Sequence, residues 1–174
     1  TRLASCLVGS EMCIRDRLYP DYTEAYLNLG NILMDKGMLD EAIDNYKEAI
    51  KINPNYADAY NNMGNAFQVN GDLDKAIDNY KEAININPNY AEAYNNLGSA
   101  LRGKLELNNS IDSFKQAIKL KPYYVDAYAN MGDAFHTSGR YKEAIESCQQ
   151  AIKIDPNYSE AYYIMGNARL DKGD

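Results

Sequence analysis

Apolar and polar residues follow one another along this chain in a pattern that repeats every 34 residues. The stretch NYADAYNNMG at 55–64 returns as NYAEAYNNLG at 89–98, YYVDAYANMG at 123–132 and NYSEAYYIMG at 157–166, and DYTEAYLNLG at 21–30 opens the series. A proline stands directly before each of these stretches, at positions 20, 54, 88, 122 and 156. A fixed period of this size indicates a repeat array, in which each unit needs its neighbours to bury its apolar face.

Counted from the third residue after each proline, the chain divides into four full units and a half unit. We expect units at 23–56, 57–90, 91–124 and 125–158, a half unit at 159–174, and the end of an earlier unit at 18–22. Positions are numbered below from the first residue of each unit.

The pattern predicts two helices in each unit. The second helix of the first unit has Leu39, Ala42, Ile43, Tyr46, Ala49, Ile50 and Ile52, close to the i, i+3, i+4 spacing of an amphipathic helix. Glycines suit the left-handed residue that ends the first helix; they stand at 37, 71, 139 and 173. Unit three has Leu105 instead, so we expect an irregular turn near 103–107.

The start of each first helix resembles a capping box, in which an asparagine caps the helix and an acid three residues later reaches back. Asn55 and Asp58 have this spacing, and so do the corresponding residues of units three and five. Tyr123 takes the cap site of unit four, so that helix should begin less cleanly.

Small residues recur where the two helices of a unit should cross, as at Gly30 and Ala42. Missing side chains let helices approach closely, and larger apolar residues then fill the space around the crossing. In unit four Cys148 replaces the aromatic residue of the other units, and we expect a buried, unreactive thiol there.

These residues resemble the tetratricopeptide repeat (TPR) family. The signature is Tyr26, Leu29, Gly30, Leu33, Ala42, Tyr46, Ala49 and Pro54, matched again by Tyr60, Met63, Gly64, Phe67, Ala76, Tyr80, Ala83 and Pro88. The resemblance covers residues 18–174 and implies an all-α fold. It further implies a TPR α-solenoid, a right-handed superhelix of antiparallel helix pairs whose first helices line a concave groove.

Polar residues lie on the first helices opposite the apolar face, at positions 2, 6, 9 and 13 of a wheel with about 100° per residue. Position 6 carries Asn28, Asn62, Asn96 and Asn130, and position 9 carries Asn31, Asn65, Ser99 and Asp133. A carboxamide both donates and accepts hydrogen bonds, so a row of asparagines can hold an extended peptide backbone whatever its side chains. We therefore predict peptide binding at these residues. The variable positions 5, 9, 12 and 13 are expected to supply specificity.

The family resemblance gives this row a precedent. In the TPR arm of O-linked N-acetylglucosamine transferases, an asparagine ladder grips polypeptide substrates, and position 6 of this chain matches it. Ile164 takes that position in the half unit, so the ladder should weaken there.

Other interpretations remain open. The asparagines could form inert polar surface. The chain could be the substrate-recruiting arm of a larger glycosyltransferase, or an architectural spacer or self-association module. The acids at position 2 could favour ligands with Lys or Arg, but helix capping also explains them.

Composition narrows the possible partners and chemistry. With 25 Asp and Glu against 18 Lys and Arg, the chain offers no broad surface for nucleic acid or anionic lipid. It has no apolar run of the roughly 18 residues that would span a membrane. His136 is the only histidine, and neither a metal motif nor a phosphate-binding loop is present. We expect a binding protein without a cofactor and without a catalytic site. The sparse cysteines fit the cytoplasm weakly.

Residues 1–17 match no part of the repeat. They resemble one reading frame of a transposase adapter used in sequencing-library preparation, and the repeat pattern resumes at Leu18. We interpret them as an artefact outside the functional argument. The chain is then expected to be an internal fragment of a longer reading frame.

Overall fold

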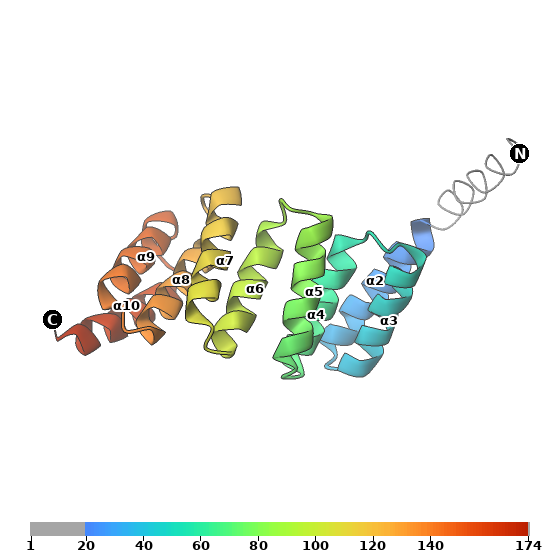
Figure 1. Ribbon diagram of the computed structural model, residues 1–174, viewed down its shortest axis with the longest axis horizontal. Coiled ribbons are helices and arrows are strands. Elements are labelled where there is room, and N and C mark those ends of the chain that lie inside the picture. Colours follow the sequence, from blue (N-terminus) through green and yellow to red (C-terminus); the bar gives the residue numbers. More distant parts are fainter. Residues whose placement is uncertain (1–19, 174) are drawn as a thin grey trace, which may run out of the picture.

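The computed structural model describes residues 20–173, so the predicted adapter segment lies outside the described residues. Every helix or strand assigned within that range is an α-helix, which confirms the all-α prediction. Figure 1 shows the helices side by side in one row, from α2 near the N-terminus to α10 near the C-terminus. They are α2 (Pro20–Asp35), α3 (Leu39–Ile52), α4 (Ala57–Val69), α5 (Leu73–Ile86), α6 (Ala91–Gly103), α7 (Leu107–Leu120), α8 (Val125–Thr137), α9 (Tyr141–Ile154) and α10 (Ser159–Lys172).

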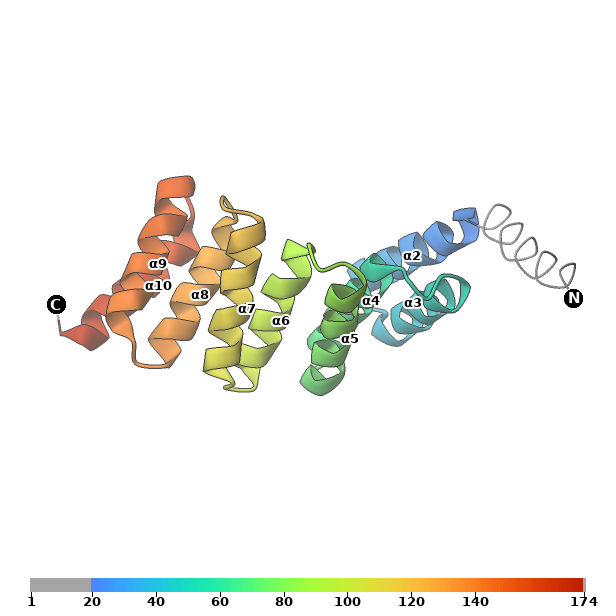
Figure 2. The same cartoon turned by 45° about the horizontal axis from the view of Figure 1, so that its top comes forward.

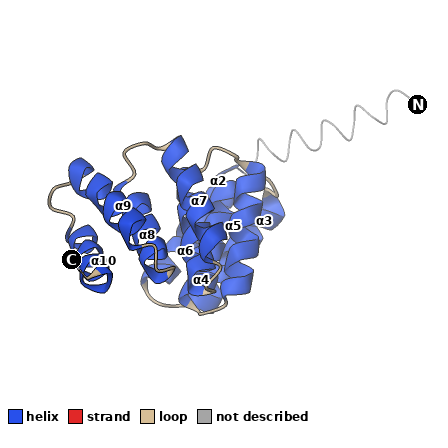
Figure 3. Ribbon diagram, turned by 60° about the vertical axis from the view of Figure 1, so that its left-hand side comes forward, coloured by secondary structure: helices blue, strands red, loops and turns tan. Residues whose placement is uncertain are grey.

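The helices pack as consecutive pairs, α2 with α3, α4 with α5, α6 with α7 and α8 with α9. Each pair rests on the next, and within 20–173 helices contact only those one or two places away in the chain. Figures 2 and 3 show the same succession from two further directions. This is the arrangement of a solenoid, whose stability is approximately a sum over units and their neighbouring interfaces. The unit boundaries themselves stay a prediction.

The helices of a pair cross closely because position 8 has no side chain. A Cβ atom built on Gly30 would lie 2.5 Å from Cε1 of the buried Tyr46, and one on Gly64 would lie 2.6 Å from the same atom of Tyr80. In unit four the buried Cys148 takes the place of the ring, with Sγ 2.6 Å from such an atom on Gly132. Burial raises the pKa of the Cys148 thiol to about 11, which keeps it protonated, as expected of an unreactive core residue.

The turns between paired helices contain the predicted left-handed glycines, with φ of 74° at Gly37, 82° at Gly71 and 75° at Gly139. The prediction of an irregular turn in unit three is wrong. Leu105 adopts φ 62° at the same place. The Glu106 N–H donates to Leu101 O over 2.9 Å, as the Met38 N–H donates to Leu33 O. The hydrogen bonds are kept, and a leucine occupies a conformation that suits glycine.

The predicted capping box is also wrong. The helix in unit two begins at Ala57, one residue beyond Tyr56, and no side chain caps it. Asn55 lies in the preceding turn, where its N–H donates to Asn53 Oδ1 over 3.1 Å. The helix of unit four starts with the same backbone geometry at Tyr124 and is no less regular, because none of these starts depends on an asparagine cap.

Candidate functional site

The asparagines predicted at position 6 lie on four consecutive first helices, α2, α4, α6 and α8. Asn28 is exposed, whereas the other three are partly buried and donate to the preceding first helix. Asn62 Nδ2 donates to Asn31 Oδ1 over 2.9 Å, and Asn130 Nδ2 donates to Asn95 Oδ1 over 3.0 Å. Asn96 Nδ2 donates to both Asn61 Oδ1 and Asn65 Oδ1, each over 3.1 Å. The row is therefore a chain of hydrogen bonds between units.

The asparagines at position 9 accept these bonds and also bind the second helix of their own unit. Tyr46 donates its hydroxyl to Asn31 Oδ1 over 2.9 Å, and Tyr80 donates to Asn65 Oδ1 over 2.8 Å. Burial raises the pKa of Tyr46 to about 12 and raises that of Tyr80 further, so both hydroxyls remain donors. The network thus joins the groove-side amides to the core.

Position 5 is buried in units one to four, which corrects the expectation that it supplies exposed, variable contacts there. Asn61 is 5% exposed and Asn95 is 7% exposed. Each is covered by position 6 of the following unit, through the bonds just described. In the half unit, the buried Ile164 lies in one apolar cluster with Ala129, the position 5 residue of unit four. From unit two onward, residue type at position 5 thus matches that at position 6 of the next unit, amide with amide and apolar with apolar. At the first junction Leu27 precedes Asn62, which donates to Asn31 instead.

A hollow of about 300 Å³ opens where units one and two meet. Among the predicted site residues, it brings together Asn31, Asn62 and Asn65. Met34 and the exposed Asp35 complete the wall, and Tyr46 contributes from the second helix. We call this the amide hollow. Carboxamide, hydroxyl, carboxylate and thioether groups face one space, which suits a polar chain with a small apolar side group.

The remaining predicted residues are not brought into this hollow. Asp133 forms an ion pair with Arg102 of the preceding unit, and Ser99 is partly buried. His136 Nε2 lies 2.8 Å from Asp171 Oδ2 of the following unit. An ion pair and a contact between His136 and Asp171 therefore add links between units three, four and five, where amides link the first four.

The acids at position 2 are held by their own chain rather than capping helices. Tyr158 donates its hydroxyl to Asp126 Oδ1 over 2.7 Å, and Lys121 Nζ lies 2.9 Å from Glu92 Oε1. The hydrogen bond from Lys121 holds the pKa of Glu92 below its usual range. These two carboxylates consequently tie the start of a first helix to the end of the same unit.

Sequence reasoning missed the buried amides at position 5. The signal was present in the pairing between units, because Asn61 precedes Asn96, Asn95 precedes Asn130, and Ala129 precedes Ile164. Read within single units, position 5 varies without order. Compared with the next unit, the position 5 residues of units two to four match position 6, whereas Leu27 of unit one does not.

No cluster of three or more His, Cys, Asp or Glu side chains within 20–173 could hold a metal ion. In the same part of the chain, no helix combines the length and apolar character needed to cross a membrane.

Comparison with known proteins identifies the repeat. The sequence model of the TPR repeat matches residues 30–71, 69–104, 102–139 and 132–173. No curated protein sequence matches the chain significantly.

Solved structures resemble the chain over most of its length. MamA is 33% identical over 88% of this chain and 84% of its own, with a TM-score of 0.78. PilF of Pseudomonas aeruginosa is 20% identical over 91% of this chain and 71% of its own, with a TM-score of 0.81. YrrB, described as a TPR protein with an unusual peptide-binding site, is 20% identical over 93% of this chain and 84% of its own, with a TM-score of 0.72.

TPR repeats are scaffolds for binding other proteins or peptides, and the matching model describes a repeat rather than a catalytic domain. Four matched copies, the paired helices and the similarity to MamA lead to one conclusion. The chain belongs to the tetratricopeptide repeat family.

Proposed function

We propose that this chain holds an extended segment of another protein against the asparagine row of α2, α4, α6 and α8. The observation that carries the proposal is the convergence of Asn31, Asn62 and Asn65 on the amide hollow. The peptide-binding site attributed to YrrB supports a peptide as the ligand, through the shared fold.

The hydrogen bonds between units refine the mechanism. The Nδ2 groups of Asn62, Asn96 and Asn130 already donate within the protein. Asn62 and Asn130 each use one of their two Nδ2 hydrogens in these bonds, so each keeps a donor and an acceptor for a peptide, whereas Asn96 donates both of its hydrogens. Asn28, exposed and outside these bonds, also offers a donor and an acceptor.

The test screens immobilised 15-residue peptides of varied sequence and then measures the binders against alanine variants. Replacing Asn62, Asn96 and Asn130 together should weaken binding at least tenfold, since each position loses about one hydrogen bond. Asn28→Ala should weaken binding without loss of stability. Asn85→Ala, an exposed asparagine on α5, is the matched control and should bind as the parent does.

A second function, an architectural spacer, is favoured by the same bonds between units. It predicts that the triple variant loses stability while no peptide in the screen binds the parent. Peptide binding unaffected by either the triple variant or Asn28→Ala would contradict the ladder. The other alternative, a recruiting arm of a larger glycosyltransferase, needs the same groove and stays a prediction.

A further inference from the structure

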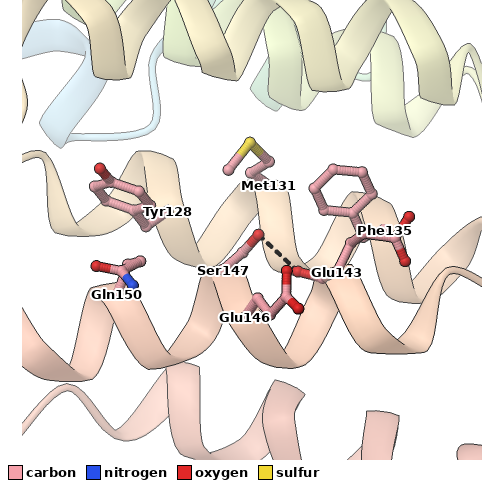
Figure 4. A pocket seen from close by; sticks show the side chains of 7 residues that line it. All are labelled: Tyr128, Met131, Phe135, Glu143, Glu146, Ser147 and Gln150. Atoms are coloured by element: carbon pink, nitrogen blue, oxygen red, sulfur yellow. Dashed lines mark hydrogen bonds between the residues drawn. The ribbon is translucent and has the colours of Figure 1, made fainter.

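A second hollow, of about 310 Å³, lies between α8 and α9. Tyr128, Met131 and Phe135 line it from α8, and Glu143, Glu146 and Gln150 line it from α9 (Figure 4). We call it the α8–α9 hollow. Its volume is at the lower end for ligand pockets, which suits a single long side chain rather than a whole ligand.

This hollow is separate from the asparagine row. Tyr128 and Asn130 are two residues apart on one helix, as are Asp133 and Phe135. At about 100° per residue, such pairs point roughly 160° apart. The α8–α9 hollow therefore opens on the side of α8 away from the proposed groove.

The lining combines an apolar wall with an acidic rim. Phe135 is almost fully buried, and Tyr128 and Met131 are partly buried. Glu146 is exposed and forms a long ion pair with Lys142, whose Nζ is 4.0 Å from Glu146 Oε1. The Ser147 hydroxyl does not donate to the carboxylates of the rim, because its Oγ donates to the backbone oxygen of Glu143 over 2.8 Å (Figure 4).

The protein itself shows which chemistry this lining accepts. The guanidinium carbon of Arg140 lies 4.4 Å from the centre of the Phe135 ring, and Arg140 Nε donates to Glu143 Oε1 over 3.0 Å. An aromatic face and a carboxylate thus already hold one guanidinium at the edge of the hollow. A guanidinium stacks on aromatic rings and pairs with carboxylates better than an ammonium does.

We propose that the α8–α9 hollow binds an arginine side chain presented by a partner protein. The methylene stem packs on Tyr128 and Met131, and the guanidinium reaches Glu146. The chain would then hold partners on two surfaces, one that recognises backbone and one that recognises a cation.

The test is a titration followed by NMR of ¹³C-methyl-labelled methionine. The probe is the capped peptide acetyl-Gly-Arg-Gly-amide in 0.15 M salt, and its uncharged counterpart has citrulline in place of arginine. Met131 reports on the α8–α9 hollow and Met34 on the amide hollow, so the two proposals are read separately. We expect a saturable shift of the Met131 methyl with arginine, little shift with citrulline, and an unchanged Met34.

Glu146→Gln should weaken binding of the arginine peptide roughly threefold, as expected for an exposed ion pair. Asp78→Asn is the matched control, because Asp78 is exposed and takes the same position in unit two. An equal loss in the control would show general attraction to a chain of net charge −7 and overturn the proposal.

Two other outcomes would also overturn it. An arginine peptide that leaves Met131 unmoved excludes the site. A Met131 signal that moves on dilution without peptide assigns the hollow to a second copy of the chain.

Discussion

At residue 105 a leucine adopts the left-handed conformation that glycine adopts at the other turns. An L side chain costs about 1–2 kcal/mol there. The side chain is 72% exposed, so its packing offsets little of that conformational cost. We expect Leu105→Gly to raise the free energy of unfolding by about 1 kcal/mol, measured by urea denaturation. Gly71→Leu should lower it by a similar amount, and a destabilised Leu105→Gly variant would show that the leucine has a packing role.

Asn96 is the most connected residue of the asparagine row, because its Nδ2 donates to both Asn61 and Asn65. Asn96→Ala removes both bonds and leaves the buried Asn61 oxygen without that donor, so stability should fall by about 2 kcal/mol. Asn28→Ala, at the same position of unit one, should change stability by less than about 0.5 kcal/mol. Equal unfolding midpoints for the two variants would contradict a structural role for the row.

At the scale of the helix, substitutions at position 8 test how closely paired helices approach. A Cβ on Gly98 would lie 2.7 Å from Cε1 of Phe114, which is fully buried and cannot move aside. Gly98→Ala should therefore lower the free energy of unfolding by about 2 kcal/mol through overpacking. Gly166 occupies the same position in α10 and has no such neighbour. Gly166→Ala should then stabilise by up to about 1 kcal/mol through helix propensity, and matching losses would refute the explanation.

Helices were well predicted from the sequence because their apolar spacing is repeated in every unit. The glycine turns were equally clear, since only a left-handed residue ends these helices in this way. Helix starts were not, because Asn55 and Asp58 have the spacing of a capping box while the chain uses a turn closed by Asn53. A local motif does not say which of two local hydrogen bonds will form.

The candidate site was predicted only in part, for a physical reason. Wheel geometry places a residue on a face of its own helix but does not say what the next unit lays over it. Position 6 was therefore predicted to lie opposite the apolar face of its own helix, while the burial of Asn61 and Asn95 came from the neighbouring helix. The two hollows depend on side chains from different helices, and no spacing within one unit indicates them.

At the scale of the whole molecule, protection of backbone amides from hydrogen exchange should vary along the array. Leu29 on α2 and Tyr163 on α10 are 45% and 72% exposed, and α10 packs only on α8 and α9 within the described chain. Inner helices are covered on both sides. We expect amide hydrogen exchange to be fastest in α2 and after Tyr158, and slowest in α5 to α7. Protection after Tyr158 equal to that of α5 would contradict a stability built from neighbouring interfaces.

The match between position 5 and position 6 of the next unit, which holds from unit two onward, makes the order of units two to five matter. Exchanging unit two for unit four would set Ala129 against Asn96 and leave an amide facing a methyl group. Newly duplicated units are identical and can take any place in the array. Each matched pair of residues at positions 5 and 6 makes a unit fit its present neighbour better than another. Units two to five are therefore not interchangeable. Recombination between them is restricted to junctions where the residue types at positions 5 and 6 agree.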